Sequence, residues 1–413
     1  MIEKPQPFRP VLTFVLLAAL FFLSQFYRVS NAVIAPNLIQ DLNLDAETLG
    51  ILGGAFFYSF ALLQIPIGPM LDRIGPRMIM TLSSWIGAFG AFLFAFGTSF
   101  ETALLGRILI GAGMSSVLMG SFKTFTLRYP PKQFATLVGI ISSVGTLGNI
   151  LAASPLAYLT SIIGWRKTFL IAGGITILLG ALIFWILKGE KINEKKALPS
   201  SEKKPEIGIF QSFRIILRSL AFWQFGAVAF FRYGIFVSLQ GLWLGPYLIY
   251  IKGFSPIQAG HILILLAIGV TLGGPIGGYL SDRIFRSRKG VTLTGLGLYS
   301  ISLFPLIGVL EINHPFWFGL IFFFIGFFCG FGMLIYSHAK DLFPITISGT
   351  VMTYVNFFTM AGAAVFMPAL GKIIESFPRI GNSYPAEAYH LSFFICFVGM
   401  AGSLIFYAFS RRQ

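Results

Sequence analysis

The sequence predicts an all-α polytopic membrane protein, with twelve transmembrane helices in two pseudo-symmetric six-helix bundles. The 413-residue chain is 56% hydrophobic and 11% charged, whereas a soluble domain is about a quarter charged. Its apolar runs are long enough to cross a bilayer core. A charged motif at Gly68–Arg77 recurs around Asp282, 210 positions after Asp72. A repeat at about half the chain length indicates a duplicated membrane architecture.

The apolar runs predict the spans directly. In the first half they are 10–38, 47–70, 78–98, 101–126, 134–162 and 166–187; in the second half they are 219–250, 255–281, 291–310, 315–339, 347–375 and 386–409. Residues 1–187 would form the N-terminal bundle and residues 219–413 the C-terminal bundle. The segment 188–218 is rich in Lys and Glu and ends in a short amphipathic stretch, so it is predicted to be a cytoplasmic linker. The motif at Gly68–Arg77 is predicted to be a cytoplasmic loop between two spans.

The basic residues are distributed asymmetrically. With the N-terminus inside, 21 of the 30 Lys and Arg fall on the predicted cytoplasmic side, five on the opposite side and four inside helices. The positive-inside rule then places both termini in the cytoplasm, and the predicted location is the cell inner (plasma) membrane. The net charge of +15 indicates no nucleic-acid partner, because the basic residues lie mostly in short loops between apolar runs and not on a soluble face. Both cysteines lie in apolar runs and indicate neither a disulfide nor a metal site.

Four cations lie inside predicted spans: Arg28, Arg107, Lys123 and Arg232. A charge in a membrane costs a few kcal/mol even on the lenient insertion scale, so each should face a cavity or a partner. Lys123 lies near the cytoplasmic end of its span, where its side chain can reach the interface. All 15 Asp and Glu fall in tails, the linker, loops or helix ends.

The arginines in the first and seventh spans therefore lack an evident carboxylate. An anionic or zwitterionic substrate is the simplest compensation, because guanidinium forks suit carboxylate and phosphate. The alternative is that backbone carbonyls, together with Glu101 or Asp41, satisfy them. The 210-residue offset pairs Pro36 with Pro246, so the first and seventh spans correspond. Their polar and aromatic residues give the predicted substrate-binding set: Arg28, Arg232, Tyr27, Asn31, Gln240 and Trp243.

The Gly68–Arg77 motif resembles the signature between helices 2 and 3 of the major facilitator superfamily, and the weaker copy at 278–283 lies where that family repeats it. Arg107–Gly113 and Gly164-Trp165-Arg166 are similar to further family motifs. The resemblance implies the major facilitator fold, alternating access around a central cavity, a monomeric state, and neither catalytic residues nor a cofactor. It also implies a conformational gating set: Gly68, Asp72, Arg73, Gly75, Arg77, Arg107, Asp282 and Arg283.

Residues 27–42 and 55–66 resemble the organic-anion branches of that superfamily, the anion:cation symporters and the organophosphate antiporters. This implies that Arg28 binds the substrate anion and that Arg232 is its counterpart. Proton coupling would need a titratable group, for which His261 and His338 are the candidates; a sodium ion or a counter-anion remains open. The alternative within transport is an exporter of drugs or siderophore-like metabolites. A resemblance to drug antiporters would require a characteristic run of glycines and a proline in the fifth span, and residues 145–155 lack it.

Overall fold

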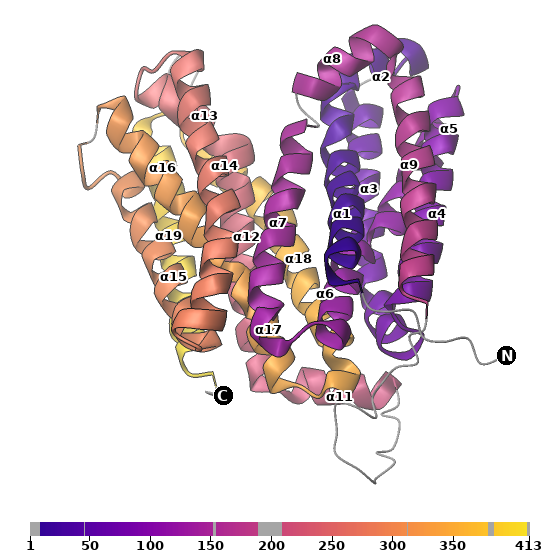
Figure 1. The fold of residues 1–413 in the computed structure, drawn as a ribbon. Coiled ribbons are helices and arrows are strands. Elements are labelled where there is room, and N and C mark those ends of the chain that lie inside the picture. The colour runs from indigo at the N-terminus through magenta and orange to yellow at the C-terminus, as the bar shows by residue number, and fades with distance from the viewer. Residues whose placement is uncertain are drawn as a thin grey trace, which may run out of the picture. The chain divides into compact units, whose positions relative to one another are not determined.

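The computed structural model describes residues 9–44, 46–151, 154–188, 209–311, 313–378 and 384–410. These residues form helices joined by turns, without a β-strand among them (Figure 1). They divide into two compact units, and each is described by itself. Unit 1 comprises 1–130, 144–209 and 345–353; unit 2 comprises 131–143, 210–344 and 354–413. The predicted division at the linker stays a prediction, since residues 189–208 of that linker lie outside the described part.

Unit 1 contains the helices of the first half of the sequence. They are α1 (Pro10–Val33), α2 (Ala35–Leu42), α3 (Ala46–Arg73), α4 (Pro76–Phe96), α5 (Phe100–Met114), α6 (Val117–Arg128), the later part of α7 (Phe134–Leu151), α8 (Ser154–Ile163) and α9 (Trp165–Ile186). The short helix η7 (Ile345–Ile347) and the first turns of α18 (Ser348–Glu375) also belong to it.

Unit 2 contains the helices of the second half together with η1 (Pro131–Gln133) and the start of α7. They are α11 (Ile209–Arg218), α12 (Leu220–Ser238), η2 (Leu239–Trp243), α13 (Leu244–Pro246), η3 (Tyr247–Ile251), α14 (Pro256–Tyr279), η4 (Leu280–Ile284), α15 (Arg288–Leu303), η5 (Phe304–Ile307), α16 (Pro315–Gly330), η6 (Phe331–Met333), α17 (Leu334–Leu342), the remainder of α18, and α19 (Ala386–Ala408).

The two units repeat the same internal packing. In unit 1, α4 packs against α5 and α9, and α3 packs against α5. In unit 2, α15 packs against α16 and α19, and α14 packs against α16. In each half, therefore, the third predicted span packs against the fourth and the sixth, and the second packs against the fourth. The duplication read from the charged motif therefore extends to the arrangement of the helices.

Local signals set several helix starts. Ser99 and Thr102 form a reciprocal capping box at the start of α5. Ser255 and Gln258 form another at α14, where Pro256 occupies the first helical position. Both arrangements satisfy backbone N–H groups that a helix end otherwise leaves without partners. Gly164 precedes α9 with φ +81°, a conformation that favours glycine.

Eleven helices among the described residues are long and apolar enough to cross a membrane. The predicted span 134–162 corresponds to α7 and α8, which lie on either side of residues 152–153. The twelve-helix count and the cytoplasmic termini stay predictions. Each of the other predicted spans coincides with one helix or with consecutive helices, and the ends agree within several residues.

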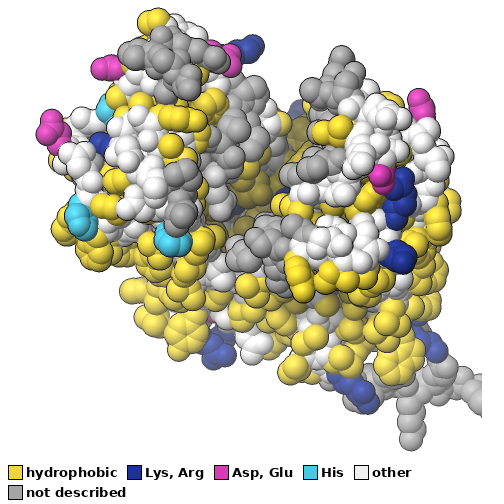
Figure 2. Space-filling model, turned by 90° about the horizontal axis from the view of Figure 1, so that it is seen from above, with side chains coloured by type: hydrophobic (Ala, Val, Ile, Leu, Met, Phe, Trp, Pro, Cys, Tyr) yellow, Lys and Arg dark blue, Asp and Glu magenta, His cyan; other side chains and the backbone are white. Residues whose placement is uncertain are grey.

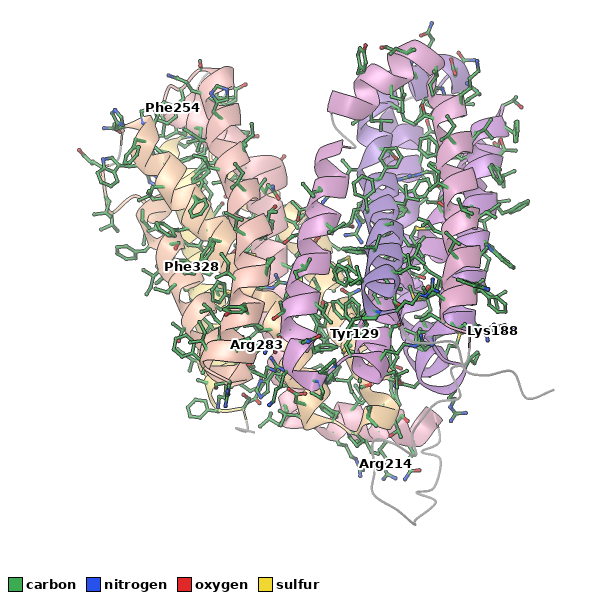
Figure 3. All side chains as sticks on the ribbon, viewed as in Figure 1. Tyr129, Lys188, Arg214, Phe254, Arg283 and Phe328 are labelled. Carbon is green, nitrogen blue, oxygen red and sulfur yellow. The ribbon has the colours of Figure 1, made fainter. Side chains whose placement is uncertain are left out.

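Large apolar side chains are exposed along these helices, as expected where lipid is the solvent. Phe89, Leu178, Ile301 and Ile405 are each more than half exposed. Seen from one end, hydrophobic side chains cover large parts of the surface of the described residues, and charged side chains are few (Figure 2). Within unit 2, Phe254 and Arg283 lie toward opposite ends of the helices, with Phe328 between them (Figure 3). The chain is a multi-pass membrane protein.

Candidate functional site

Arg28 lies on α1 and is partly buried beside three aromatic rings of α3. Its guanidinium carbon is 6.0 Å from the ring centroids of Phe56 and Phe57, and 5.1 Å from that of Phe60. These rings give it cation–π contacts and little else, because its buried Nε has no hydrogen-bond partner among the described residues. No carboxylate of the described chain pairs with it.

Arg107 on α5 is fully buried next to the same aromatic group. Its guanidinium carbon lies 5.4 Å from the Phe56 centroid and 5.9 Å from the Phe94 centroid. One Nη donates a hydrogen bond to the backbone carbonyl of Tyr27 (2.9 Å), while Nε and the other Nη lack partners among the described residues. Two guanidinium groups thus lie within 6.0 Å of one phenylalanine ring. This part of unit 1 is electropositive, and several guanidinium N–H donors in it have no acceptor among the described residues.

Neither acid named as an alternative partner reaches this pair. Asp41 accepts hydrogen bonds from Arg166 and from the indole of Trp165 (2.9 Å). These two bonds, with Trp165 contributing most, hold the pKa of Asp41 below its ordinary value despite some desolvation. Glu101 is exposed in the first turn of α5. Among the described residues, neither acid pairs with Arg28, so its anion partner stays a prediction.

The remaining predicted ligands of the first span differ in position. Tyr27 is fully buried, and its hydroxyl shares a hydrogen bond of 3.1 Å with Thr176 of α9. Its ring packs on Phe169, so this side chain points into the packed interior of unit 1. Its backbone carbonyl accepts the hydrogen bond that orients Arg107. Asn31 belongs to α1, but its side chain lies outside the described part.

Arg232 of α12 is buried within unit 2, with 2% of its surface exposed. One Nη donates to the backbone carbonyl of Cys329 (3.2 Å), and Nε lacks a partner among the described residues. A Cβ at Gly332 would lie 1.9 Å from Cδ of Arg232, so the guanidinium stem needs glycine there. The carbonyl that it contacts stands just before η6, the 3₁₀ break between α16 and α17. The arginine therefore satisfies a backbone group at an irregular point of the helix.

Gln240 and Trp243 lie on η2, a π-helical stretch that follows α12. Both side chains are partly buried, and the buried indole Nε1 of Trp243 has no hydrogen-bond partner among the described residues. The first span is irregular at the matching place, because α1 ends at Val33 and α2 restarts with Pro36 near its beginning. Interrupted helices in both halves are typical of membrane transport proteins near their binding sites.

Asp72, in the last turn of α3, caps the start of α18 within unit 1. Its Oδ1 accepts hydrogen bonds from Nζ of Lys123 (2.6 Å) and the backbone N–H of Gly349 (2.9 Å). Its Oδ2 accepts the backbone N–H of Thr350 (2.7 Å) and the hydroxyl of the same residue (2.6 Å). Both charged side chains are 5% exposed. We call these four residues the Asp72 cap.

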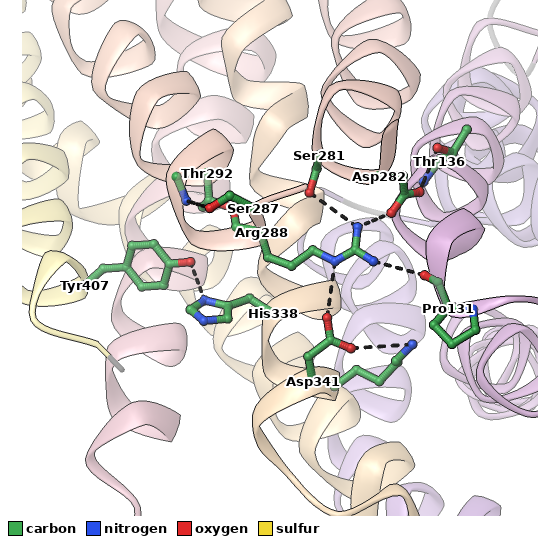
Figure 4. Close-up of polar contacts among 12 residues, drawn as sticks. Pro131, Thr136, Ser281, Asp282, Ser287, Arg288, Thr292, His338, Asp341 and Tyr407 are labelled. Carbon is green, nitrogen blue, oxygen red and sulfur yellow. Dashed lines mark hydrogen bonds and ion pairs between the residues drawn. The ribbon is translucent and has the colours of Figure 1, made fainter. Parts of the chain in front are cut away.

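Asp282 makes the equivalent contact within unit 2, at the start of α7. Its Oδ2 accepts the backbone N–H and the hydroxyl of Thr136, both at 2.8 Å, and its Oδ1 pairs with Arg288. Arg288 also contacts Asp341 (3.2 Å) and donates to the carbonyl of Pro131 (3.0 Å), as Figure 4 shows. We call Asp282, Arg288 and Thr136 the Asp282 cap.

The two caps share one design. In each, the threonine is the third residue of its helix, and a glycine four residues before the aspartate lies against that threonine. A Cβ at Gly68 would lie 2.8 Å from Cα of Thr350, and one at Gly278 would lie 2.7 Å from Cα of Thr136. The glycines allow the helices to approach, and the carboxylate then meets the positive end of a helix. Each capped helix comes from the opposite half of the sequence.

The comparisons with known proteins fit this duplicated geometry. A family model described as the Major Facilitator Superfamily matches residues 16–367 and, in a second match, 233–413. The chain belongs to this superfamily. Its fold is similar to a solved structure titled as a major facilitator transporter, FucP, in the outward conformation, with a TM-score of 0.70, 17% identity, and coverage of 94% of this chain and 98% of that one.

Curated relatives of this facilitator carry the names of anion transporters. It is 25% identical over 282 residues to the "Probable sulfoacetate transporter SauU" of Cupriavidus necator, covering 66% of this chain and 65% of that relative. It is 26% identical over 377 residues to a "Probable hexose phosphate transport protein" of Chlamydia pneumoniae (85% and 82% covered). It is 24% identical over 386 residues to the "Probable galactarate/D-glucarate transporter GudP" of Escherichia coli (84% and 83% covered). The chain therefore spans just under two thirds of the length of the first of these relatives.

Two expectations for this facilitator need correction. The motif at Gly68–Arg77 is not a ten-residue loop, because α3 continues to Arg73 and α4 begins at Pro76. The turn is only two residues long, and Gly75 takes φ +91° there. Lys123 does not extend to the interface. Lys123 is 4% exposed and pairs with Asp72. A cation this deeply buried needs a carboxylate partner to offset its desolvation.

The second motif copy departs from the first because of a π turn. Asp282 and Arg283 lie in η4, a π-helical segment that uses one residue more per turn than an α-helix. The residue with positive φ is consequently Arg286 (+48°), four positions after the aspartate instead of three. Phe285, where the first copy has glycine, keeps ordinary helical angles.

The other predicted gating and coupling residues occupy distinct positions. Arg77 donates to the carbonyl of Phe184 (2.9 Å) near the end of α9, and Arg73 ends α3. Arg283 lines a small open pocket with Tyr279 and the start of α7. His261 is exposed on α14. His338 is buried and bonded through Nδ1 to the hydroxyl of Tyr407 (2.7 Å; Figure 4).

Several residues of the two caps were missed at the sequence level. The threonines at the starts of α7 and α18 are inconspicuous, but Ala135-Thr136 and Gly349-Thr350 share a small residue followed by threonine after a proline-containing loop. The 210-residue offset does not pair these threonines, because it aligns Thr136 with Thr346 and Thr350 with Ile140. Arg288 was counted only for orientation, since its pairing with Asp282 depends on the π turn between them.

Proposed function

We propose that this facilitator is a secondary active transporter of a small organic anion, working by alternating access, with Arg28 as the principal anion ligand. The observation that carries the proposal is the pair of guanidinium groups around Phe56 with no carboxylate among the described residues. The names of the relatives support the same class, since sulfoacetate, hexose phosphate and glucarate are all organic anions.

The electrostatics favour an anion at Arg28 over Arg107. Arg107 is fully buried and has a backbone carbonyl as partner, whereas Arg28 is partly exposed and has only aromatic contacts with the described residues. Two positive charges in a medium of low dielectric repel each other, and an anion next to one of them relieves both. A guanidinium also binds carboxylate, sulfonate or phosphate through two parallel hydrogen bonds. Arg28 is thus the group that a substrate can reach.

The test is thermal stabilisation of the purified protein by a panel of carboxylates, phosphates and sulfonates. We expect at least one anion to raise the unfolding temperature, because a ligand that binds only the folded state stabilises it. Arg28→Ala should abolish that shift and Arg28→Lys should retain part of it, since lysine keeps the charge without the fork. Arg214→Ala on α11, whose side chain is exposed (Figure 3), is the matched control. A shift that survives Arg28→Ala would refute the assignment.

For gating, we propose that the two caps are made and broken during the transport cycle. Each cap consists of a buried carboxylate, a cation and a helix start, so losing it changes the free energy of one conformation selectively. Membership of the superfamily suggests that the caps hold the outward-facing state. Gly68, Gly75, Arg73 and Arg77 would shape the Asp72 cap, and Arg283 would shape the Asp282 cap. Arg107 would act from the membrane span that also carries Lys123 of the Asp72 cap.

Coupling to a proton, a sodium ion or a counter-anion is a separate proposal. His338 is the better placed of the two histidines for proton coupling, because it is buried and bonded to Tyr407, whereas His261 is exposed. The check is a transport assay against an imposed pH gradient with His338→Gln; unchanged proton dependence would exclude this histidine. The exporter alternative finds no support in the names of these relatives. A monomeric state also stays a prediction.

A further inference from the structure

The side-chain amide oxygens of two residues near Arg28 are buried without hydrogen-bond partners among the described residues. The amide oxygens of Gln25 on α1 and Asn149 on α7 are inaccessible to solvent, and neither has a partner among the described residues. A polar group left unpaired in a membrane interior costs free energy comparable to a lost hydrogen bond, and buried polar groups in proteins are nearly always paired. The two amide oxygens therefore indicate a hydrogen-bond donor from outside the described residues.

The backbone brings these amides to one place in unit 1. Gly148, the neighbour of Asn149, lies so close to α1 that an added Cβ would be 2.6 Å from the carbonyl oxygen of Phe22 and 3.3 Å from Cβ of Gln25. Gln25 precedes Arg28 by three positions, which places both on one face of α1, about 4.5 Å apart along the axis. Gln25 and Arg28 therefore share one face of α1, and Asn149 lies on the part of α7 that packs near that face.

We infer that Gln25 and Asn149 bind hydroxyl groups of the substrate, so that the transported anion is a hydroxylated carboxylate or a sugar phosphate and not a bare short-chain acid. This inference rests on the proposed function. A carboxamide presents one acceptor and two donors, and a hydroxyl can both donate and accept. Either orientation of each amide therefore suits a hydroxyl. An unsubstituted alkyl chain would leave both amides unpaired, and such sites discriminate strongly against ligands that lack the hydrogen-bonding group.

The experiment compares pairs of anions that match in charge and carbon number: glucarate with adipate, gluconate with hexanoate, and glycerol 3-phosphate with propyl phosphate. Binding is measured by thermal stabilisation of the full-length purified protein, titrated to an apparent Kd. The variants are Gln25→Leu and Asn149→Leu. Gln40→Leu, an exposed glutamine on α2, controls for the substitution itself. The unfolding temperature without ligand is recorded for each, since a packing role would lower it, whereas removing an unpartnered amide should not.

We expect the hydroxylated member of at least one pair to bind tenfold or more tightly than its partner. Each leucine variant should weaken its binding by about three- to tenfold, the size of one neutral hydrogen bond, and leave the unsubstituted acid unaffected. Equal binding of both members, or a preference unchanged in both variants, overturns the inference while leaving anion binding at Arg28 intact. Stabilisation by no anion, or stabilisation that persists in Arg28→Ala, instead overturns the proposed function and this inference with it.

Discussion

Replacing Asp72 with Asn is the most informative single change. An asparagine oxygen in place of Oδ2 can still accept both hydrogen bonds from Thr350. Its amide then faces the ammonium of Lys123 and the N–H of Gly349, which are donors that formerly met Oδ1 at 2.6 and 2.9 Å. Two contacts are lost, and a cation with 5% of its side chain exposed is left without its carboxylate.

The magnitude follows from these contacts. Stranding one partner of a buried ion pair costs about 3–5 kcal/mol. That shifts an equilibrium between conformations by roughly a hundredfold to a few thousandfold, at about 1.4 kcal/mol per factor of ten. If the Asp72 cap holds one transport conformation, Asp72→Asn should slow transport at least tenfold and leave anion affinity within about threefold of wild type, because the substitution is remote from Arg28.

The assay is uptake into proteoliposomes of an anion identified in the stabilisation panel, with Kd measured in parallel on purified protein. A second variant, Asp72→Asn with Lys123→Met, removes the stranded charge and should recover at least half of the lost thermal stability. Wild-type uptake rates and unfolding temperature in Asp72→Asn would refute the reasoning. Normal stability combined with slow transport would contradict the energy estimate but retain the gating role.

Three further outcomes are expected. Arg288→Met should destabilise the protein by about 3–5 kcal/mol, because it strands a buried carboxylate of unit 2; chemical denaturation of the purified protein measures it. Gln64→Leu removes the donor to the carbonyl of Ser115 (2.9 Å) at the break between α5 and α6 and should cost about 1–3 kcal/mol by the same measurement, with no change predicted in anion Kd. Asp41 has a lowered pKa, so its contribution to stability is present above the unfolded-state pKa and is lost as pH falls through the folded-state value. Thermal unfolding between pH 6 and about pH 3 should therefore show an acid-side loss that Asp41→Asn reduces, with an unchanged profile counting against the bond to Trp165.

The sequence was sufficient to predict the fold and to single out Arg28 as a candidate anion ligand, because both leave signals in the composition. Apolar runs report the lipid environment directly, and a lone arginine such as Arg28 in such a run is conspicuous whatever its neighbours. The same logic located Asp72, since a charged motif between spans stands out. The spacing of 210 residues then found its partner at Asp282.

What sequence reasoning missed depends on tertiary approach. Lys123 looked like an interfacial lysine because its pairing with Asp72 joins residues 51 positions apart. The polar contacts that satisfy helix breaks were equally hidden: Gln64 bonds to the carbonyl of Ser115, and Arg232 to that of Cys329. A helix break is a local backbone event, and nothing in the apolar pattern marks which distant side chain will compensate it.

The composition of the caps has a consequence for biosynthesis. Asp72 is translated long before Thr350, so the nascent chain must hold Asp72 and Lys123 in the membrane with only each other until almost all of the protein has been made. Conversely, Asp282 finds Thr136 already in place when it emerges. A chain divided within residues 189–208 would give two fragments, each with an aspartate whose helix start resides in the other. Such fragments should accumulate stably only when they are co-expressed.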